Sequence, residues 1–493
     1  MLAYICQVHR VLARGRGVSC RTIRKISTGH ARRAVVLGTA IPEATSEPPE
    51  PPGSFGPPVT WPRASLEPND YWRTNPWLKD VSIKDFTSWR WGVKNIIETP
   101  HGDTKKLLEF LNAVLPAAVP NIKDIGGFQS RDAFMGDVIS GIRKSTMSVR
   151  VMPYALSRMN WMDPANDPIF RQFIPLGSAM ISDHPRLELD SLHEQKDSPV
   201  EGLVHRYPDK ALFLPVGVCP TYCIFCTRSY GIGADTDLVV KKTFKLSLKR
   251  LETAFNYMEE HSEIRDIVVS GGDAFYLPPH ILEWIGDRLT GMKHIERFRF
   301  ASKGLAVAPN RFIDAEDPWT NALIRVSDKA KRAGKHMALH THINHPDEIS
   351  WITEQASLRL LQSGVTVRNQ TVLLRGVNDN VQTMSTLIQK LAQMAIQPYY
   401  VYQCDMVLKT EHLRTPLSTI LDIEKQIQGE IAGFYMPKFV VDLPGGGGKR
   451  PASLFESYDR ETGVSTFTQP SLKGKGREGK VYKYYDPIHT GIP

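Results

Sequence analysis

Two hydrophobic periods alternate along residues 205–442 and predict a parallel α/β fold. Short apolar runs typical of buried strands are separated by longer segments in which apolar residues recur every three or four positions. Leu251, Ala254, Phe255 and Met258 form one such helical face. Helices that connect successive strands imply parallel pairing, in a βα barrel or an open sheet. The predicted strands are 211–217, 266–270, 297–302, 337–342, 365–373 and 398–403, followed by a shorter seventh strand at 438–442.

The residues before this region divide into three parts. Residues 69–204 combine dense aromatics with helical apolar spacing and predict a helical N-terminal region. Residues 43–68 are rich in Pro, Glu and Ser and predict a disordered linker. Residues 1–42 contain seven Arg, one Lys and no Asp or Glu, which is typical of a mitochondrial transit peptide. We therefore expect import into the mitochondrial matrix; the alternative is a disordered basic tail that binds RNA nonspecifically.

Charge and composition exclude several classes of protein. The first 42 residues account for eight of the net +9 charges, so the rest of the chain is close to neutral and no nucleic-acid partner is expected. No apolar stretch is long enough to cross a bilayer, so no membrane association is expected. Six cysteines in 493 residues, three of them in one loop, argue against a secreted disulfide scaffold.

Those three cysteines, Cys219, Cys223 and Cys226, follow the first predicted strand at C-x3-C-x2-C spacing. Three thiolates at this spacing suit three corners of a four-iron cluster, which prefers soft sulfur ligands. The alternatives are packed core thiols or a structural zinc site. A zinc site usually has four ligands in two separated pairs, and the remaining cysteines supply no second pair. A histidine could complete it, so zinc stays open at this point.

Polar motifs follow the predicted strands at their carboxyl ends, where the loops of a βα barrel converge on substrate. They are Cys219–Cys226 after the first strand, Ser270–Asp273 after the second, His340, His342 and His345 at the fourth, Arg368–Gln370 near the end of the fifth, and Cys404 and Asp405 after the sixth. We therefore expect these side chains to face a common site.

Several of these motifs together resemble the lysine 2,3-aminomutase family of radical S-adenosylmethionine (SAM) enzymes. They are HRYPDK at 205–210, the cysteine loop followed by Thr227 and Arg228, SGGDA at 270–274, THINHP at 341–346, GVND at 376–379, YYVYQCD at 399–405 and FVVDLPGGGGK at 439–449. The resemblance runs from about residue 70 to 460. It implies an α/β fold with a partial (β/α)6 barrel at 205–435, the helical N-terminal region as a cap, and a C-terminal extension at 436–493.

The resemblance implies that the three cysteines bind a 4Fe-4S cluster whose fourth iron binds SAM. Ser270, Gly271, Gly272, Asp273, His342 and Gln370 match the positions that surround SAM in the family. An electron donor such as a ferredoxin or flavodoxin-like protein would reduce the cluster. The product of SAM cleavage would be a 5'-deoxyadenosyl radical.

Lys449 follows four glycines, which allow the backbone to approach a ligand closely. A lysine that forms a Schiff base must be partly desolvated so that it can be neutral. A nucleotide-binding loop is the weaker alternative, because no Ser or Thr follows Lys449. The resemblance implies that Lys449 binds pyridoxal 5'-phosphate (PLP) covalently. It also places four residues around PLP: Arg206, Tyr207, Lys210 and Lys303. The family has arginine at the last two, so the charge is kept but the bidentate fork is lost.

The resemblance implies that Arg228 binds the carboxylate of the substrate, while Asp405 and Asp442 bind the distal ammonium of L-lysine. The reaction would interconvert L-lysine and β-lysine by moving the amino group between C2 and C3. The alternatives are another amino acid, a protein-linked lysine, or a noncatalytic iron-sulfur scaffold. The family's structural zinc site is missing, since Asn380 follows GVND and no cysteine follows Cys404; a homo-oligomer stays open.

Overall fold

The structure, a computed structural model, describes residues 69–469, 471–472, 477 and 479–488. The predicted transit peptide at 1–42 and linker at 43–68 lie outside the described residues. No helix in the described part of the chain has the length and apolar character needed to span a membrane.

The main sheet confirms the predicted parallel α/β fold. Among the described residues it has nine strands in the order β13-β12-β11-β10-β9-β8-β7-β6-β5, and β6 through β12 are parallel. All seven predicted strands are present, with bounds that differ by a residue or so. They are β6 (Lys210–Val216), β7 (Asp266–Gly271), β8 (Arg297–Ala301), β9 (His336–Thr341), β10 (Thr366–Leu373), β11 (Gln397–Gln403) and β12 (Lys438–Leu443).

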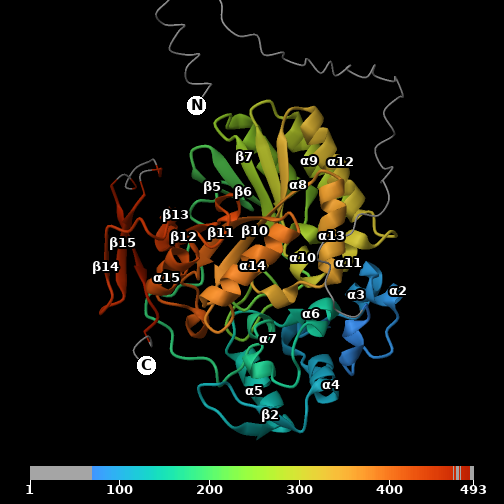
Figure 1. The fold of residues 1–493 in the computed structure, drawn as a ribbon. Coiled ribbons are helices and arrows are strands. Elements are labelled where there is room, and N and C mark those ends of the chain that lie inside the picture. The colour runs from blue at the N-terminus through green and yellow to red at the C-terminus, as the bar shows by residue number, and fades with distance from the viewer. Residues whose placement is uncertain (1–68, 470, 473–476, 478, 489–493) are drawn as a thin grey trace, which may run out of the picture. The chain divides into compact units, whose positions relative to one another are not determined.

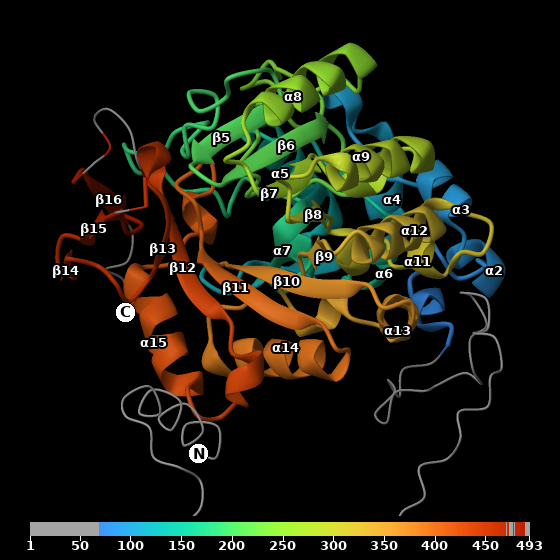
Figure 2. The same cartoon turned by 90° about the horizontal axis from the view of Figure 1, so that it is seen from above.

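The sheet curves into an arc, and the connecting helices cover its outer side (Figure 2). These helices bury the apolar faces that the 3.6-residue period predicts; Leu251, Ala254, Phe255 and Met258 are all buried. Strand β10 shows the complementary alternation. Its odd-numbered residues from Val367 to Leu373 are buried, and its even-numbered residues are half-exposed. The outer helices are α8 (Leu248–Glu260), α9 (Pro279–Gly291), α10 (Gly304–Val307), α11 (Asn310–Ile313), α12 (Trp319–Arg332), α13 (Trp351–Gln362), α14 (Val381–Gln393) and α15 (Leu417–Ile427).

Two antiparallel strands at the edges of the sheet were not predicted. Strand β5 (Leu203–Tyr207) pairs with β6, and β13 (Gly448–Pro451) pairs with β12. The glycine tract forms the reversal between β12 and β13, with positive φ at Gly445 and Gly446. Lys449 therefore lies on a strand rather than in a loop, directly opposite Asp442.

The N-terminal elements lie beneath the main sheet in Figure 1, coloured blue to teal. Helices predominate, as predicted, with two small antiparallel sheets, β1-β4 and β2-β3. The elements are α2 (Ile83–Phe86), α3 (Trp89–Lys94), β1 (Ile97–Glu98), α4 (Lys105–Val114), β2 (Ala118–Pro120), β3 (Phe128–Ser130), α5 (Arg131–Arg143), β4 (Arg150–Val151), α6 (Pro153–Ser157) and α7 (Phe170–Phe173).

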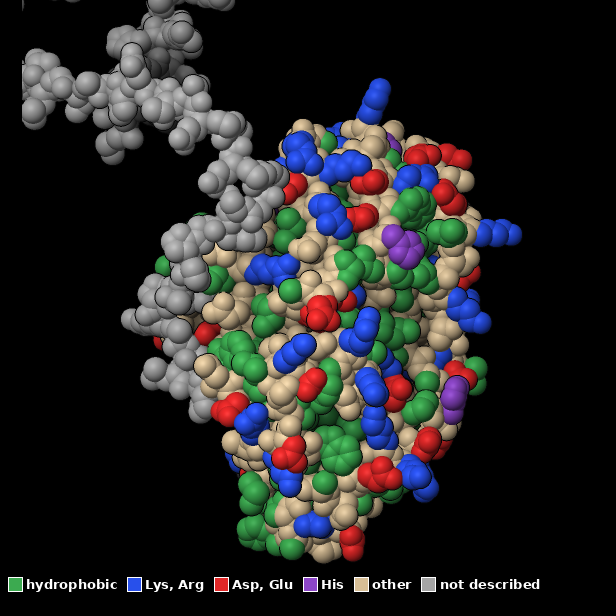
Figure 3. Space-filling model, turned by 90° about the vertical axis from the view of Figure 1, so that its right-hand side faces the viewer, with side chains coloured by type: hydrophobic (Ala, Val, Ile, Leu, Met, Phe, Trp, Pro, Cys, Tyr) green, Lys and Arg blue, Asp and Glu red, His purple; other side chains and the backbone are tan. Residues whose placement is uncertain are grey.

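A separate three-stranded antiparallel sheet follows β13, made of β14 (Ser457–Asp459), β15 (Val464–Thr468) and β16 (Val481–Tyr485). It packs against β12, α15 and the glycine turn through a second apolar cluster that includes Phe467, Tyr482 and Tyr484. On the face shown in Figure 3, acidic and basic side chains are interspersed.

Candidate active site

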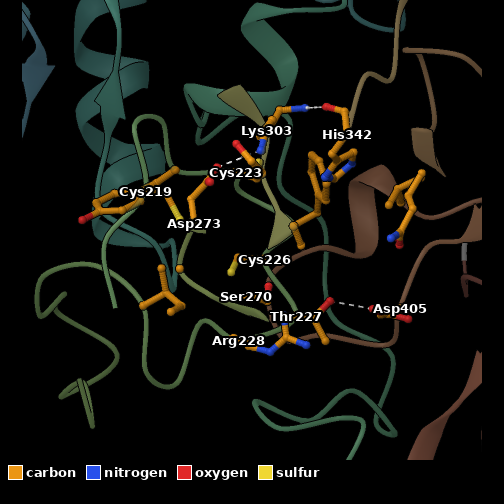
Figure 4. Close-up of a pocket in the computed structure, with 18 of the residues that line it drawn as sticks. Cys219, Cys223, Cys226, Thr227, Arg228, Ser270, Asp273, Lys303, His342 and Asp405 are labelled. Atoms are coloured by element: carbon orange, nitrogen blue, oxygen red, sulfur yellow. Dashed lines mark hydrogen bonds between the residues drawn. The ribbon is translucent and has the colours of Figure 1, made fainter. Parts of the chain in front are cut away.

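One cavity of about 270 Å³ collects most of the predicted site residues at the carboxyl ends of the strands. Figure 4 shows residues of the cysteine loop together with residues at or just beyond the carboxyl ends of β7, β8, β9 and β11 around it. The predicted residues that line it are Cys219, Cys223, Cys226, Arg228, Ser270, Gly271, Gly272, Asp273, Lys303, His342, Gln370, Asp405 and Lys449. The expectation that motifs from separate strands face a common site therefore holds for these residues.

The cysteine loop is fixed from one side by the two glycines that end β7. Gly272 N–H donates to the carbonyl of Val216 at 2.6 Å, and Asp273 N–H donates to the carbonyl of Val218 at 3.0 Å. A Cβ on Gly271 would lie 2.2 Å from the Val216 oxygen, and one on Gly272 would lie 2.5 Å from the Val218 oxygen. Only glycine allows this approach, so the two glycines position the cysteine loop as well as lining the cavity.

The N-terminal region fixes the same loop from the other side. Arg150 on β4 donates from Nε to the carbonyl of Cys219 at 3.0 Å, and its own carbonyl accepts from Tyr222 N–H at 2.9 Å. Ile224 N–H donates to the carbonyl of Gln172 at 2.9 Å. The cap therefore helps to form the site.

The three thiols are chemically suited to a cluster. Burial raises the pKa of all three, to about 12 for Cys223, which disfavours free thiolates and favours neutral thiols until a metal replaces the proton. The described part of the chain contains no group of three or more His, Cys, Asp or Glu side chains arranged to hold a single metal ion. The corners of a four-iron cluster lie further apart than the ligands of one ion, so cluster ligation does not require that arrangement.

A cation lies near each thiol. The sequence analysis gave two of these cations, Lys303 and Arg228, to other ligands and gave Arg150 and Lys241 no role. The charge of Arg150 favours the thiolate of Cys219, and that of Lys303 favours the thiolate of Cys223. Arg228 and Lys241 act in the same way on Cys226. These charges partly offset the cost of burying a negative cluster.

Three of the predicted SAM residues, Asp273, His342 and Gln370, are held by hydrogen bonds to neighbouring residues. Burial raises the pKa of Asp273 to about 6, and its carboxylate accepts from Phe275 N–H and Lys303 N–H, each at 2.8 Å. The Gln370 amide lies 3.2 Å from His340 Nδ1, and the buried Nε2 of His340 has no hydrogen-bond partner among the described residues. His342 pairs with Asn344 at 3.0 Å, and burial together with Lys303 lowers its pKa. Polar atoms therefore remain available to a ligand in this part of the cavity.

Lys303 lines the same cavity as Lys449, but its own polar contacts are with His342 and Glu348 rather than with the other predicted PLP residues. Its Nζ donates to the carbonyl of His342 at 2.8 Å and lies 3.7 Å from Glu348. In Figure 4 it lies with His342 at one end of the cavity, while Arg228 and Asp405 lie at the other. Its position favours a role beside the cysteines, and its assignment to PLP stays a prediction.

Lys449 lies on the edge strand β13 and contacts Tyr207 on β5, the strand at the opposite edge of the main sheet. Its backbone N–H donates to Tyr207 Oη at 2.7 Å, and a Cβ on Gly448 would lie 2.3 Å from the same oxygen. Its Nζ lies 2.9 Å from Asp442 Oδ2 and 5.7 Å from the centre of the Tyr402 ring.

The structure favours the charged form of Lys449 over the neutral form that a Schiff-base lysine must be able to reach. Desolvation lowers the pKa of Lys449, but Asp442, Tyr402 and Tyr207 outweigh it and hold the pKa well above the ordinary lysine value. Lys449 is therefore an ammonium here, because its carboxylate partner is close and buried.

The other predicted PLP residues lie behind Lys449, outside the cavity lining. Arg206 forms a buried ion pair with Asp197 at 2.6 Å and donates to the carbonyl of Leu192. The Lys210 ammonium lies 4.3 Å from the centre of the Tyr207 ring. Tyr207 therefore contacts Lys449 directly, and Arg206 acts on Asp442, the carboxylate that pairs with Lys449; their assignment to PLP stays a prediction.

Arg228 already has a carboxylate partner. Its Nε and Nη2 donate to the two oxygens of Glu194 at 2.8 and 2.7 Å, and Tyr230 Oη donates to Glu194 at 3.0 Å. Glu194 was missed by the sequence analysis, because an acidic residue in a polar stretch without periodicity gives no signal. A substrate carboxylate would share or replace this partner.

Asp405 and Asp442 each present one free oxygen. Thr227 Oγ1 donates to Asp405 Oδ2 at 2.6 Å, while Asp405 Oδ1 and Asp442 Oδ1 are buried without a hydrogen-bond partner among the described residues. Burial, followed by the charge of Asp442, raises the pKa of Asp405 to about 7. Two unpaired carboxylate oxygens suit a ligand that carries a cation.

The chain is similar to several aminomutases of known name, while no family model matches it. It is 35% identical to an L-lysine 2,3-aminomutase of Clostridium subterminale over 403 residues, which cover 80% of this chain and 86% of that protein. It is 34% identical to the L-lysine 2,3-aminomutase of Bacillus subtilis (strain 168), over 78% of this chain and 72% of that protein. A glutamate 2,3-aminomutase of Clostridioides difficile (strain 630) is 31% identical, over 66% and 72%. A crystal structure of Streptococcus suis SuiB bound to S-adenosylmethionine matches with a TM-score of 0.34 and 10% identity over 50% of this chain and 52% of that chain, which is too weak to support an inference.

Proposed function

The chain belongs to the lysine 2,3-aminomutase family, and from this premise we propose that it is a radical SAM, PLP-dependent aminomutase that interconverts L-lysine and β-lysine. The observation that carries the proposal is the single cavity that contains three thiols, an arginine, a carboxylate with a free oxygen and Lys449. A lysine aminomutase needs each of these groups next to the others.

The residues present fit the implied cofactors. Cys219, Cys223 and Cys226 would bind the cluster, and the polar atoms around Asp273 and His340 suit SAM. Lys449 would bind PLP, with Tyr207 next to it. When bound, the cluster and SAM supply a radical that removes hydrogen, and PLP supplies the conjugated carbonyl group that lets an amino group migrate.

The chain's own residues orient the substrate between these groups. Arg228 offers a guanidinium to the α-carboxylate, and its pairing with Glu194 shows that it accepts a carboxylate in bidentate geometry. Asp405 offers its free oxygen to the distal ammonium. Arg228 and Asp405 lie toward the same end of the cavity, and together they offer the two charges that a zwitterion with a cationic side chain requires.

The same charges distinguish lysine from glutamate as substrate. A glutamate side chain would bring a third carboxylate next to Asp405 and Asp442. Burial, and then the charge of Asp442, already raise the pKa of Asp405. A distal ammonium would instead offset this negative charge. The proposal is therefore lysine, although one similar protein is named as a glutamate enzyme.

Anaerobic product analysis tests the proposal. Reconstituted protein would be incubated with SAM, PLP, dithionite and, in parallel, L-lysine, L-glutamate or a lysine-containing peptide. We expect β-lysine from free L-lysine alone. Product from glutamate or from the peptide would reassign the substrate, and iron-loaded protein that converts none of them would favour a noncatalytic scaffold.

We also propose mitochondrial localisation and reduction by a ferredoxin or flavodoxin-like protein. The first rests on the composition of residues 1–42, which contain eight basic and no acidic residues. A fluorescent fusion of residues 1–60 is expected to accumulate in mitochondria; a fusion that stays in the cytosol would contradict this.

A further inference from the structure

Lys241 lies in the segment between the cysteine loop and α8, which the sequence analysis gave no role. Its side chain is buried, with only 8% of the residue exposed. Its Nζ donates to the backbone carbonyls of Thr146 and Ser229 and lies 3.7 Å from Met147 Sδ. It therefore joins the N-terminal cap to the chain three residues beyond Cys226.

The atoms that Nζ contacts directly are carbonyl and thioether groups, and burial lowers the pKa of Lys241 to about 8, so the side chain is mostly an ammonium at pH 7. Among the ion pairs of the described residues, none gives Lys241 a carboxylate partner; Asp235 binds its backbone N–H instead, at 2.7 Å. Burying an ammonium among carbonyl and thioether groups is costly unless a negative charge lies nearby. Met147, which Nζ contacts, lines the same cavity as Cys226, and both Cys219 and Cys226 pack against the apolar cluster that contains Met147, so the ammonium lies in the wall of the cysteine site.

The other cations next to the cysteines differ in this respect. Arg150, beside Cys219, is paired with Glu98. Lys303, beside Cys223, has Glu348 at 3.7 Å. Part of the field of each is cancelled by its own carboxylate. Lys241 forms no ion pair among the described residues, although Asp235 adds a negative charge nearby, so its field on the cysteine loop is offset less than the fields of Arg150 and Lys303.

We propose that Lys241 is the fixed positive charge beside Cys226 that raises the reduction potential of the cluster. This inference rests on the cluster of the proposed function and deepens it. Reduction of [4Fe-4S]²⁺ to [4Fe-4S]⁺ adds one electron, supplied by an external one-electron donor, and no bond forms or breaks. The reduced cluster carries one more negative charge, so a nearby cation stabilises it more than the oxidised cluster. Lys241 is thus a positioning residue that acts through the cluster.

The test is the midpoint potential of the full-length reconstituted protein, measured by redox titration with detection of the reduced cluster by electron paramagnetic resonance. SAM, PLP and substrate are left out, so the measurement does not depend on activity. The variants are Lys241→Gln, which is neutral but can still donate to a carbonyl, Lys241→Met, and Lys241→Arg, which keeps the charge. Lys242→Met, an exposed neighbour, is the matched control. Iron content is measured for every protein.

We expect the Gln and Met variants to bind iron normally and to have about a tenth of the wild-type reduced-to-oxidised ratio at a fixed potential, a shift of about 59 mV to lower values. Lys241→Arg and Lys242→Met should retain the wild-type midpoint. Wild-type midpoints in Gln and Met variants that contain iron would overturn the inference. Loss of iron in the Gln variant but not in the Arg variant would also overturn it, because Lys241 would then only hold the cap and the cysteine loop together. If the wild-type protein forms no cluster, both the proposed function and this inference are wrong. If the variants form a normal cluster with an unchanged midpoint potential, only this inference is wrong.

Discussion

Lys449 Nζ lies 2.9 Å from Asp442 Oδ2, and the two residues are direct partners across the antiparallel pair β12 and β13. The resemblance assigns these two residues to different ligands: Lys449 to PLP and Asp442 to the distal ammonium of the substrate. In the structure the carboxylate of Asp442 is already paired with Lys449. A distal ammonium that binds Asp442 would therefore compete with the ammonium of Lys449.

Replacing Asp442 tests this pairing. In Asp442→Asn the pKa of Lys449 should fall, because the carboxylate that raises it is gone. PLP should then bind covalently at lower pH, measured by the visible absorbance of lysine-bound PLP across a pH series. The KM for lysine should rise as well. Asp422→Asn, an exposed change on α15, is the control; the same pH profile in both variants would contradict the pairing.

Removing Lys449 should abolish covalent PLP binding. Lys449→Ala should lose the visible absorbance of bound PLP and retain less than about 1% of the aminomutase rate, since no other lysine lines the cavity except Lys303. Lys438→Ala, an exposed lysine at the start of β12, should bind PLP normally. Full activity in Lys449→Ala would show that the PLP assignment is wrong.

Asp405 predicts how substrate binding depends on pH. Its pKa is raised to about 7, so the carboxylate that accepts the distal ammonium forms as the pH rises through 7. The KM for lysine should therefore fall between pH 6 and pH 8. In Asp405→Asn the KM should rise by about tenfold or more, because a buried charge partner is lost, and the pH dependence should flatten. A KM that is independent of pH in the wild type would count against this role.

The same pKa has a consequence for stability. A carboxyl group with a pKa of about 7 in the folded state and an ordinary value near 3.8 when unfolded gives stability at low pH that is lost as the pH rises through 7. Asp405→Asn should therefore have a higher Tm than wild type at pH 8, and the gain should shrink toward pH 5. Differential scanning calorimetry at the two pH values measures it; an equal gain at both would rule out this cause.

The glycines after β7 predict a separate effect on cluster binding. In Gly272→Ala the new Cβ would lie 2.5 Å from the backbone oxygen of Val218, so the cysteine loop must move. We expect a loss of about 2 kcal/mol in unfolding free energy, together with reduced iron content. Gly136→Ala in α5, where no atom lies within 4 Å of the new Cβ, should leave iron content unchanged and keep or increase stability. Wild-type iron content in Gly272→Ala would contradict the positioning role.

The sequence alone determined the strand and helix pattern, because burial imposes a periodicity of two or of 3.6 on every strand and helix that packs in the core. It also identified the cysteine loop, the glycines after β7 and Lys449, since these are short motifs whose residue types are fixed by local chemistry. Placement of these motifs at the carboxyl ends of parallel strands follows from topology.

Only the tertiary structure decided which charges meet. Glu194 reaches Arg228 across 34 residues, Lys241 reaches the carbonyl of Thr146 across 95, and Tyr207 reaches Lys449 across 242. The glycine tract gives no sign of the edge strand that sets Lys449 opposite Asp442. A periodic pattern records which side of an element faces the core, but the partner of a buried charge depends on how distant segments pack. The protonation of Lys449 and the field around the cysteines could therefore be read only from the folded chain.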